Sequence, residues 1–197
     1  PIAFTNGYHP GPRIAIANAL SLGMTSSGEV VDFEMIRRME VEEFRAKLAE
    51  KLPPELPIYS VEEVDVRSPS ANKLLEKAEY VLTVVGEGED LPSQIQQWVE
   101  TVNNSTEILF EKTTKSGKTR EINLRDRLFS LTLESDPPQP PLEEGGAKEV
   151  KLRYVGSCKN DGTVLQPEHL IYMLEQVSEQ NIELVRAHRE GLILSVE

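Results

Sequence analysis

The stretch that decides the fold is Tyr80-Val81-Leu82-Thr83-Val84-Val85 (residues 80–85), together with the segment that follows it, residues 91–102. The first is a short run of aliphatic, aromatic and β-branched residues, a composition typical of a strand. The second has Pro92 in its first turn, where a missing N–H costs little, and predicts an amphipathic helix. The apolar stripe of that helix consists of Ile95, Trp98, Val99 and Val102.

The residues after this helix continue the alternation of strands and helices. We expect a hairpin at 108–112 and 119–124 around Lys115-Ser116-Gly117-Lys118, strands at 128–133, 150–155, 182–185 and 192–196, and a helix at 167–177. A loose linker is expected at residues 136–146, which hold four prolines and two glycines. From residue 79 the order is therefore β-α-hairpin-β-β-α-β, which is typical of a ferredoxin-like unit with an inserted arm near residues 108–124.

The pattern before residue 79 is shorter. We expect strands at 13–17, 29–35 and 58–66 and a helix at 41–52, whose apolar side carries Phe44, Leu48 and Leu52. The order β-β-α-β is the same unit without its first strand and helix. The fold class is therefore α+β, with two ferredoxin-like halves: residues 1–78, truncated at the N-terminus, and residues 79–197, which carry the hairpin arm.

Composition limits the classes of function. The chain has 197 residues and a formal net charge of -12, which disfavours nucleic acid as a partner overall but permits a local basic patch. Its single cysteine, Cys158, excludes an internal disulfide and any all-cysteine metal site built by this chain alone. No apolar run approaches the roughly 20 residues that span a bilayer. We expect a cytoplasmic protein without a membrane partner, whose true N-terminus lies upstream because no initiating Met opens the chain.

The first candidate site is the loop Gly7-Tyr8-His9-Pro10-Gly11-Pro12-Arg13. Prolines and glycines restrain this loop, and Tyr8, His9 and Arg13 offer an aromatic ring, an imidazole and a cation for substrate or anion binding. The alternative is a turn that only positions the following strand. The hydroxyl-rich loop 21–29 could also hold an anion, but it matches no phosphate-binding motif and favours a structural role.

The second candidate site is the basic stretch 112–127. It contains six cationic residues and two acidic ones, in contrast to the acidic chain as a whole. Alternate residues of a hairpin share a face, so we expect an exposed cationic face for phosphate groups, with Gly117 at its tip. The expected members of that face are Lys115, Lys118, Arg120 and Arg125. The alternative is a solvated arm whose lysines prevent edge pairing.

Other polar residues predict no chemistry of their own. His169 is expected on a helix surface, and Arg186-Ala187-His188-Arg189 is expected as a basic turn before Gly191. Cys158 has no histidine near it in sequence, which disfavours a nucleophilic role. We expect neither catalytic residues nor metal ligands in this chain.

Several stretches together resemble one family, an uncharacterised domain fused to or encoded beside cobalamin-binding radical SAM proteins and called the radical-SAM-linked protein. Two positions depart from the family pattern: Gly11 stands where members carry a basic residue, and Cys158 stands in a turn that is otherwise rich in glycine. Members also begin earlier, with a strand and a basic helix. The stretches that carry the resemblance are residues 1–10, Ala19-Leu20-Ser21-Leu22-Gly23, Ser26 with Gly28-Glu29, Ala78-Glu79-Tyr80, Lys115-Ser116-Gly117-Lys118, Ile122 with Leu124-Arg125, Gly156-Ser157 and Pro167-Glu168.

The resemblance implies an accessory, substrate-recognising C-terminal domain of a radical SAM protein. The 4Fe-4S cluster, S-adenosylmethionine and cobalamin would then be bound by the parent protein or by a neighbour, and none by this chain. Members occur beside RNA-processing genes, which suggests RNA as a substrate. The alternative function is a stand-alone RNA-binding module of ferredoxin-like type.

Overall fold

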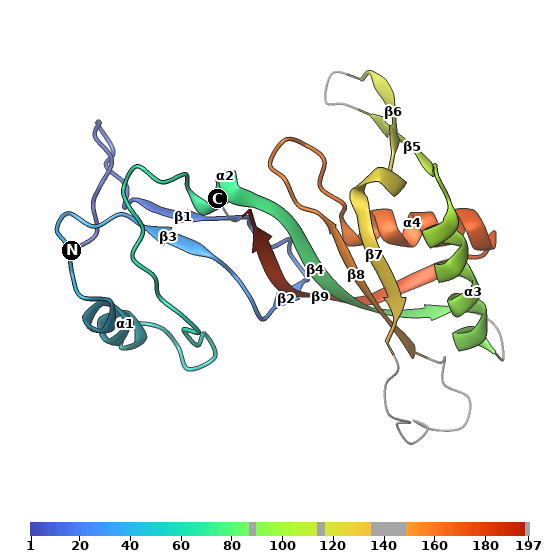
Figure 1. Ribbon diagram of the computed structural model, residues 1–197, viewed down its shortest axis with the longest axis horizontal. Coiled ribbons are helices and arrows are strands. Elements are labelled where there is room, and N and C mark those ends of the chain that lie inside the picture. Colours follow the sequence, from blue (N-terminus) through green and yellow to red (C-terminus); the bar gives the residue numbers. More distant parts are fainter. Residues whose placement is uncertain (87–89, 114–116, 135–148, 196–197) are drawn as a thin grey trace.

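A five-stranded sheet of segments far apart in sequence organises the chain (Figure 1). The computed structural model describes residues 1–86, 90–113, 117–134 and 149–195. The strand order in the sheet is β2-β9-β4-β8-β7; β2 pairs with β9 in parallel and the other neighbours are antiparallel. The strands are β2 (Thr25–Ser26), β4 (Leu75–Gly86), β7 (Leu128–Leu133), β8 (Glu149–Ser157) and β9 (Ile182–Leu194).

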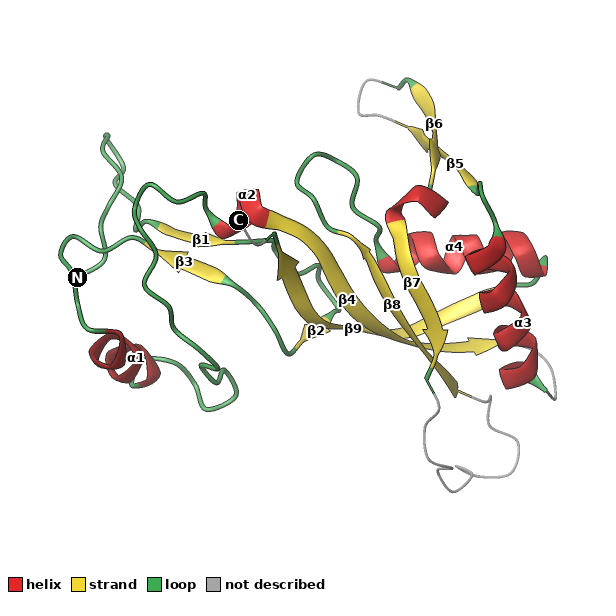
Figure 2. Cartoon of the chain, in the orientation of Figure 1, coloured by secondary structure: helices red, strands yellow, loops and turns green. Residues whose placement is uncertain are grey.

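Helices α3 (Leu91–Asn104) and α4 (Pro167–Ser178) pack together on this sheet (Figure 2). Alternate residues of β4 and β8 are buried, so each strand turns one face to a common core. The helices contribute residues at helical spacing to the same core. Members of this core include Leu82, Val84, Leu152, Tyr154, Ile95, Val99, Leu170 and Leu174.

The expectation of a mixed α+β chain is confirmed, and the helices and strands expected between residues 79 and 177 form within the described residues. One difference concerns the last two strands, expected at 182–185 and 192–196. They are a single strand, β9, because its ladder with β4 continues through Ala187, His188 and Arg189 to Leu194 with only local register shifts. The supposed basic turn at 186–189 therefore lies inside the sheet. The linker expected at 136–146 lies outside the described residues.

The N-terminal part forms a smaller sheet. Strands β1 (Ile14–Ile16) and β3 (Val31–Phe33) pair antiparallel, and helices α1 (Val41–Ala49) and α2 (Ala71–Leu74) follow. The strand expected at 58–66 is wrong, because these residues join neither this sheet nor the larger one. Their alternation of apolar and acidic side chains suits a strand, but a strand also needs a neighbour with which to exchange hydrogen bonds. Of residues 1–70, Ala17 alone is buried.

The smaller sheet joins the larger one through a close backbone approach at Gly28. A Cβ atom on Gly28 would lie 2.5 Å from the carbonyl oxygen of Glu190 and 2.9 Å from the Cα of Gly191. Beside it, Ser27 N donates to Arg189 O at 3.0 Å, which continues the parallel pairing of β2 with β9. A side chain at position 28 would force these two backbones apart.

No helix of the described residues is both long and apolar enough to cross a membrane.

The close backbone approach at Gly28 predicts that Gly28→Ala destabilises the fold. The added methyl group meets backbone rather than a side chain that can move, so we expect a loss of about 1–3 kcal/mol in the free energy of unfolding. Urea denaturation measures the loss. Gly191→Ala is the matched control, because a Cβ there meets no atom within 4 Å. Equal denaturation midpoints for the two variants would contradict the prediction.

Candidate functional site

A hairpin arm, β5 (Leu109–Thr113) and β6 (Thr119–Asn123), leaves the body of the domain beside α4 (Figure 1). Its register pairs Lys112 with Arg120 and Glu111 with Glu121. Directly opposed residues share a face of a hairpin, and successive pairs alternate between faces. Lys112 and Arg120 therefore lie on one face, which we call the cationic face, while Glu111 and Glu121 lie on the other.

The base of the arm is anchored on α4. The ring of Phe110 lies 5.0 Å from that of Tyr172 and 5.1 Å from that of His169, in edge-to-face arrangements. Tyr172 also donates its hydroxyl hydrogen to Leu109 O at 3.0 Å, and the Ile122 side chain of β6 is buried. These contacts fix the orientation of the cationic face relative to the sheet.

Lys118 and Arg120 are exposed as expected, and Lys115 lies outside the described residues. The expectation that Arg125 joins the cationic face is wrong. Its guanidinium turns inward, where Nη1 donates to Leu128 O at 2.8 Å and Nη2 to Asn103 O at 3.0 Å. The cause is a 3-10 turn at Arg125–Arg127, which redirects the chain after β6. Arg125 thereby satisfies a carbonyl in the last turn of α3, a place where cations are favourable.

Arg127 contributes to the charged surface around the base of the arm, whereas Arg125 does not. Its Nη1 donates to Gly162 O at 3.4 Å and to Val164 O at 3.3 Å, so it holds the loop between β8 and α4. Burial lowers the pKa of Arg127, with a further contribution from Arg120. The pKa of His169 is also lowered, first by burial and then by Arg127 and Lys112. Both shifts therefore arise mainly from burial, and the neighbouring cations add a smaller contribution.

A groove of about 460 Å³ lies between β6, the 3-10 turn and the β8–α4 loop. Each of the three elements contributes one cation, namely Arg120, Arg127 and Lys159. The half-exposed ring of Phe129 in β7 also lines it. The volume suits a small ligand or a short segment of a larger one.

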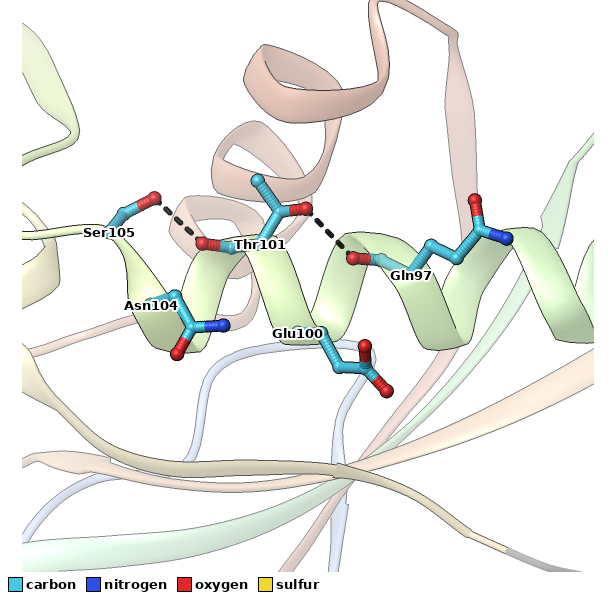
Figure 3. A pocket seen from close by; sticks show the side chains of 5 residues that line it. All are labelled: Gln97, Glu100, Thr101, Asn104 and Ser105. Atoms are coloured by element: carbon cyan, nitrogen blue, oxygen red, sulfur yellow. Dashed lines mark hydrogen bonds between the residues drawn. The ribbon is translucent and has the colours of Figure 1, made fainter.

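A second concavity, on the outer surface of α3, has a different character (Figure 3). Its hydroxyls bond within the helix: Thr101 Oγ1 donates to Gln97 O at 2.8 Å, and Ser105 Oγ donates to Thr101 O at 2.8 Å. Glu100 and Asn104 complete a lining drawn entirely from one helix and its C-terminal cap. Such i to i−4 bonds are ordinary for helix surfaces, so this hollow presents no groups that converge on a ligand.

The N-terminal loop does not bring its three candidate residues together. Tyr8 is 95% exposed, and its ring lies edge-to-face with that of the neighbouring His9, with the two centroids 5.0 Å apart. Arg13 instead donates from Nη1 to both carboxylate oxygens of Glu34, at 2.7 and 3.0 Å. This ion pair links the segments that lead into β1 and out of β3, at the opposite end of the molecule from the arm (Figure 1).

Sequence reasoning missed a buried polar network at Arg189. This side chain is 1% exposed, and it donates to both carboxylate oxygens of Glu29 and to the side chain and carbonyl of Asn18. Burial raises the pKa of the nearby Cys158 thiol, and Arg189 opposes the shift. Alternation along one long strand, with Ala187 and Arg189 on the same side, was the signal that could have found it.

The His188 side chain links β2 to β9 and is not part of a turn. Thr25 Oγ1 lies 2.7 Å from His188 Nδ1, and Ser27 Oγ lies 2.8 Å from His188 Nε2. Both ring nitrogens are therefore occupied by hydroxyl groups of the 25–27 segment. Loop 21–29 consequently has a structural role here, as the sequence favours.

The fold and the arm define a mixed α+β protein whose candidate site is a cationic surface beside a groove. The chain belongs to a family described as an uncharacterized protein conserved in bacteria (DUF2344), which matches residues 1–167. No curated protein sequence matches it. A solved chain from the "Crystal Structure of a Cbf5-Nop10-Gar1 Complex" is similar over 91% of this chain and 40% of that one, at 11% identity and a TM-score of 0.49. This likeness is too low to carry an argument about fold or function, and the present chain spans less than half of that one.

The inward position of Arg125 predicts that Arg125→Ala costs stability. The part-buried carbonyl of Leu128 and the exposed carbonyl of Asn103 lose a charged donor, so we expect a loss of about 1–1.5 kcal/mol in the free energy of unfolding. The matched control is Arg120→Ala on the exposed face, with a change within about 0.5 kcal/mol. Chemical denaturation of both variants checks this pair, and a larger loss for Arg120→Ala would contradict the inward placement of Arg125.

His169 predicts a pH dependence of stability. Its ring lies at the start of α4, where Gln166 N donates to Nδ1 at 3.2 Å and a neutral ring is required. Because the folded state lowers the pKa of His169, the unfolded state binds more protons near and below the ordinary value of 6.5. Stability from the neutral ring is therefore present above that value and lost as pH falls through the folded pKa.

The test is NMR titration of the three histidine rings, in which His169 should titrate below the ordinary value. Relative to the wild type, His169→Gln should become less unfavourable as the pH is lowered, because glutamine keeps a polar group at this position but has no proton to gain. A His169 titration midpoint above 6.5 would show that the ring is charged in the folded state.

Proposed function

We propose that the chain is an accessory, substrate-recognising domain of a cobalamin-binding radical SAM protein, and that it works in the cytoplasm beside a catalytic domain in the same chain or in a neighbouring protein. The observation that carries the proposal is an uncovered apolar face in the N-terminal part. The resemblance of the sequence motifs to the radical-SAM-linked family supplies the identity of the partner.

The apolar face lies on the β1–β3 ribbon. The register pairs Ile16 with Val31 and Ile14 with Phe33, so these four side chains share one face. The ring of Phe44 in α1 packs on Phe33 at 5.4 Å. The other three remain open, with exposures of 43% for Ile14, 54% for Ile16 and 37% for Val31. A two-stranded ribbon is marginally stable unless further structure packs on it, so this face favours a covering partner.

The opposite face of the ribbon is already occupied. Asp32 accepts a hydrogen bond from Ala71 N at 2.8 Å, and Asn72 donates to Ala17 O at 2.8 Å. Helix α2 and the start of β4 therefore lie on that side. A partner that covers the ribbon can approach only the face that carries Ile14, Ile16 and Val31.

The order of the strands in the large sheet supports a finer description of the fold. We propose that residues 79–197 form a ferredoxin-like half, because β4, β7, β8 and β9 follow the connectivity and strand order of a split β-α-β unit, with the arm inserted between α3 and β7. Residues 1–78 would be an incomplete half, in which β1, β3 and α1 supply only part of the unit. A strand and a helix from the rest of the protein would complete it and cover the open face.

The cofactors of such a protein would be bound by the partner domain. An iron–sulfur cluster is held by several cysteine thiolates, whereas this chain has one cysteine, and burial raises the pKa of that Cys158 thiol. These residues do not fit the cluster, and we derive no reaction step through it. The role left for this chain is to bind and position the substrate.

The proposal predicts a complex with the radical SAM partner. The purified chain, mixed with the cognate radical SAM protein, should elute with it in gel filtration. Ile14→Glu combined with Ile16→Glu should weaken the complex about tenfold or more, because two charges would be buried at the interface. Val185→Glu is the matched control, since Val185 is a similarly exposed apolar residue of the other sheet.

Two results would overturn this function. One is the absence of any complex at micromolar concentrations of the two proteins. The other is cluster assembly and cleavage of S-adenosylmethionine by the isolated chain after anaerobic reconstitution.

The thermal midpoints of the Ile14→Glu/Ile16→Glu variant and of Val185→Glu should equal that of the wild type, because the substituted residues are exposed in the isolated chain.

The second candidate function is a stand-alone RNA-binding module. The separation of Lys112 and Arg120 from Glu111 and Glu121 on the arm favours it, because one face is left without acidic residues of the hairpin. RNA binding by the chain, combined with failure to form the complex, would favour this candidate over the first.

A further inference from the structure

Phe129 is displaced from the core by a β-bulge. The ladder between β7 and β8 pairs Leu128 with Gly156 and then Ser130 with Val155, so Phe129 is the extra residue. The bulge lets Leu128 and Leu131 both reach the core, and it leaves the Phe129 side chain outside. Bulges of this kind commonly aim a side chain at a functional surface.

The Phe129 ring offers a stacking surface on the part that Lys77 does not cover. It is 50% exposed, and Lys77 Nζ lies 4.3 Å from its centroid, in a cation–π contact. The ammonium group keeps positive charge beside the aromatic ring. A large apolar ring held at the surface between cations is the combination that receives a nucleic-acid base together with its phosphates.

The groove next to Phe129 provides the cations. Arg120 comes from β6, Arg127 from the 3-10 turn and Lys159 from the β8–α4 loop. Arg127 is already oriented by the carbonyl groups of Gly162 and Val164, so less conformational freedom is lost when it meets a phosphate.

Carboxylates in the same groove restrict what can bind. Asp161 is committed to its own turn, where it accepts from Thr163 N at 2.9 Å and from Thr163 Oγ1 at 2.6 Å. Glu121 and Asp126 also line the groove. A duplex would bring two phosphate backbones to this mixed surface, whereas a single strand can direct phosphates to the cations and base amino groups to the carboxylates.

The open face of the sheet limits the path of the strand. Arg153 is surrounded there by Glu79 at 2.6 Å, Glu134 at 2.5 Å and Glu190 at 3.8 Å, so its charge is more than neutralised. A polyanion would be repelled from this part of β8. The favourable path therefore runs from Phe129 through the groove and along the cationic face of the arm.

We infer that this groove binds a short single-stranded nucleic-acid segment, with one base stacked on Phe129 and the adjacent phosphates held by Arg120, Arg127 and Lys159. The inference deepens the proposed function, because it names the class of substrate that the accessory domain recognises. It uses only residues of this chain, and binding therefore requires no partner.

The experiment is fluorescence anisotropy of a labelled, mixed-sequence, single-stranded oligoribonucleotide with the isolated chain at low salt. Phe129→Ala should weaken binding about tenfold or more, whereas Phe129→Trp should retain it, because stacking needs only an aromatic face. Arg120→Glu should weaken binding and flatten its dependence on salt. Matched controls are Tyr59→Ala and Lys51→Glu, an exposed aromatic residue and an exposed cation of the N-terminal part.

Three results would overturn the inference. They are wild-type affinity in Phe129→Ala, an equal loss of affinity in Tyr59→Ala, and tighter binding of the duplex than of the single strand. Retained binding by Phe129→Trp, with an unchanged thermal midpoint, guards against a folding artefact. Because the partner protein is absent from this assay, its outcome is separate from the complex test: loss of nucleic-acid binding would leave the association with the radical SAM protein intact.

Discussion

The ion pair between Arg189 and Glu29 is the interaction on which the arrangement of the whole chain depends. Arg189 lies in β9 of the large sheet, while Glu29 and Asn18 belong to the N-terminal part, so the bonds join segments more than 150 residues apart in sequence. A buried arginine left without its partner costs about 3–5 kcal/mol. The lower end of that range applies here, because the Glu29 side chain keeps 31% of its surface exposed.

The same junction explains several nearby features. Gly28 has no side chain because the backbone of β9 lies against it, and Ser26 and Ser27 both bond to Arg189 O. Three residues that stand together in the sequence thus serve one contact. Ser26 supplies a hydrogen bond, Gly28 permits the close approach of the backbones, and Glu29 supplies the negative charge. Residues 1–70 bury little apolar surface, so this polar contact is what stabilises the position of the N-terminal part. The rest of the chain is stabilised by its apolar core.

Periodicity predicted the second half of the chain well because its elements pack into one core. In β4, α3, β8 and α4 the apolar residues follow the period of the element, and burial enforces that period. The same reasoning failed at 58–66, where an alternating pattern has no neighbouring strand, and it divided β9 in two because Arg186, His188 and Arg189 suggested a turn. Arg189 is buried, and a buried cation in a strand is stable only with a partner; here the partner is Glu29, which is distant in sequence and which local sequence does not reveal.

The candidate site was predictable in part for similar reasons. The hairpin and the exposure of Lys118 and Arg120 follow from turn chemistry and alternation. The inward turn of Arg125 depends on a carbonyl group of α3, and the outward position of Phe129 depends on a bulge against β8. Both are properties of tertiary contacts, so no local pattern indicates them.

The scarcity of buried residues in the N-terminal part has a calorimetric consequence. The heat capacity change of unfolding arises mainly from apolar surface that becomes exposed to water, and the first 70 residues have little left to expose. The heat capacity increment of this chain should therefore fall below the value usual for 197 residues. The N-terminal part can also open as a separate unit while the large sheet stays folded, since what holds it is a small number of polar bonds at one seam.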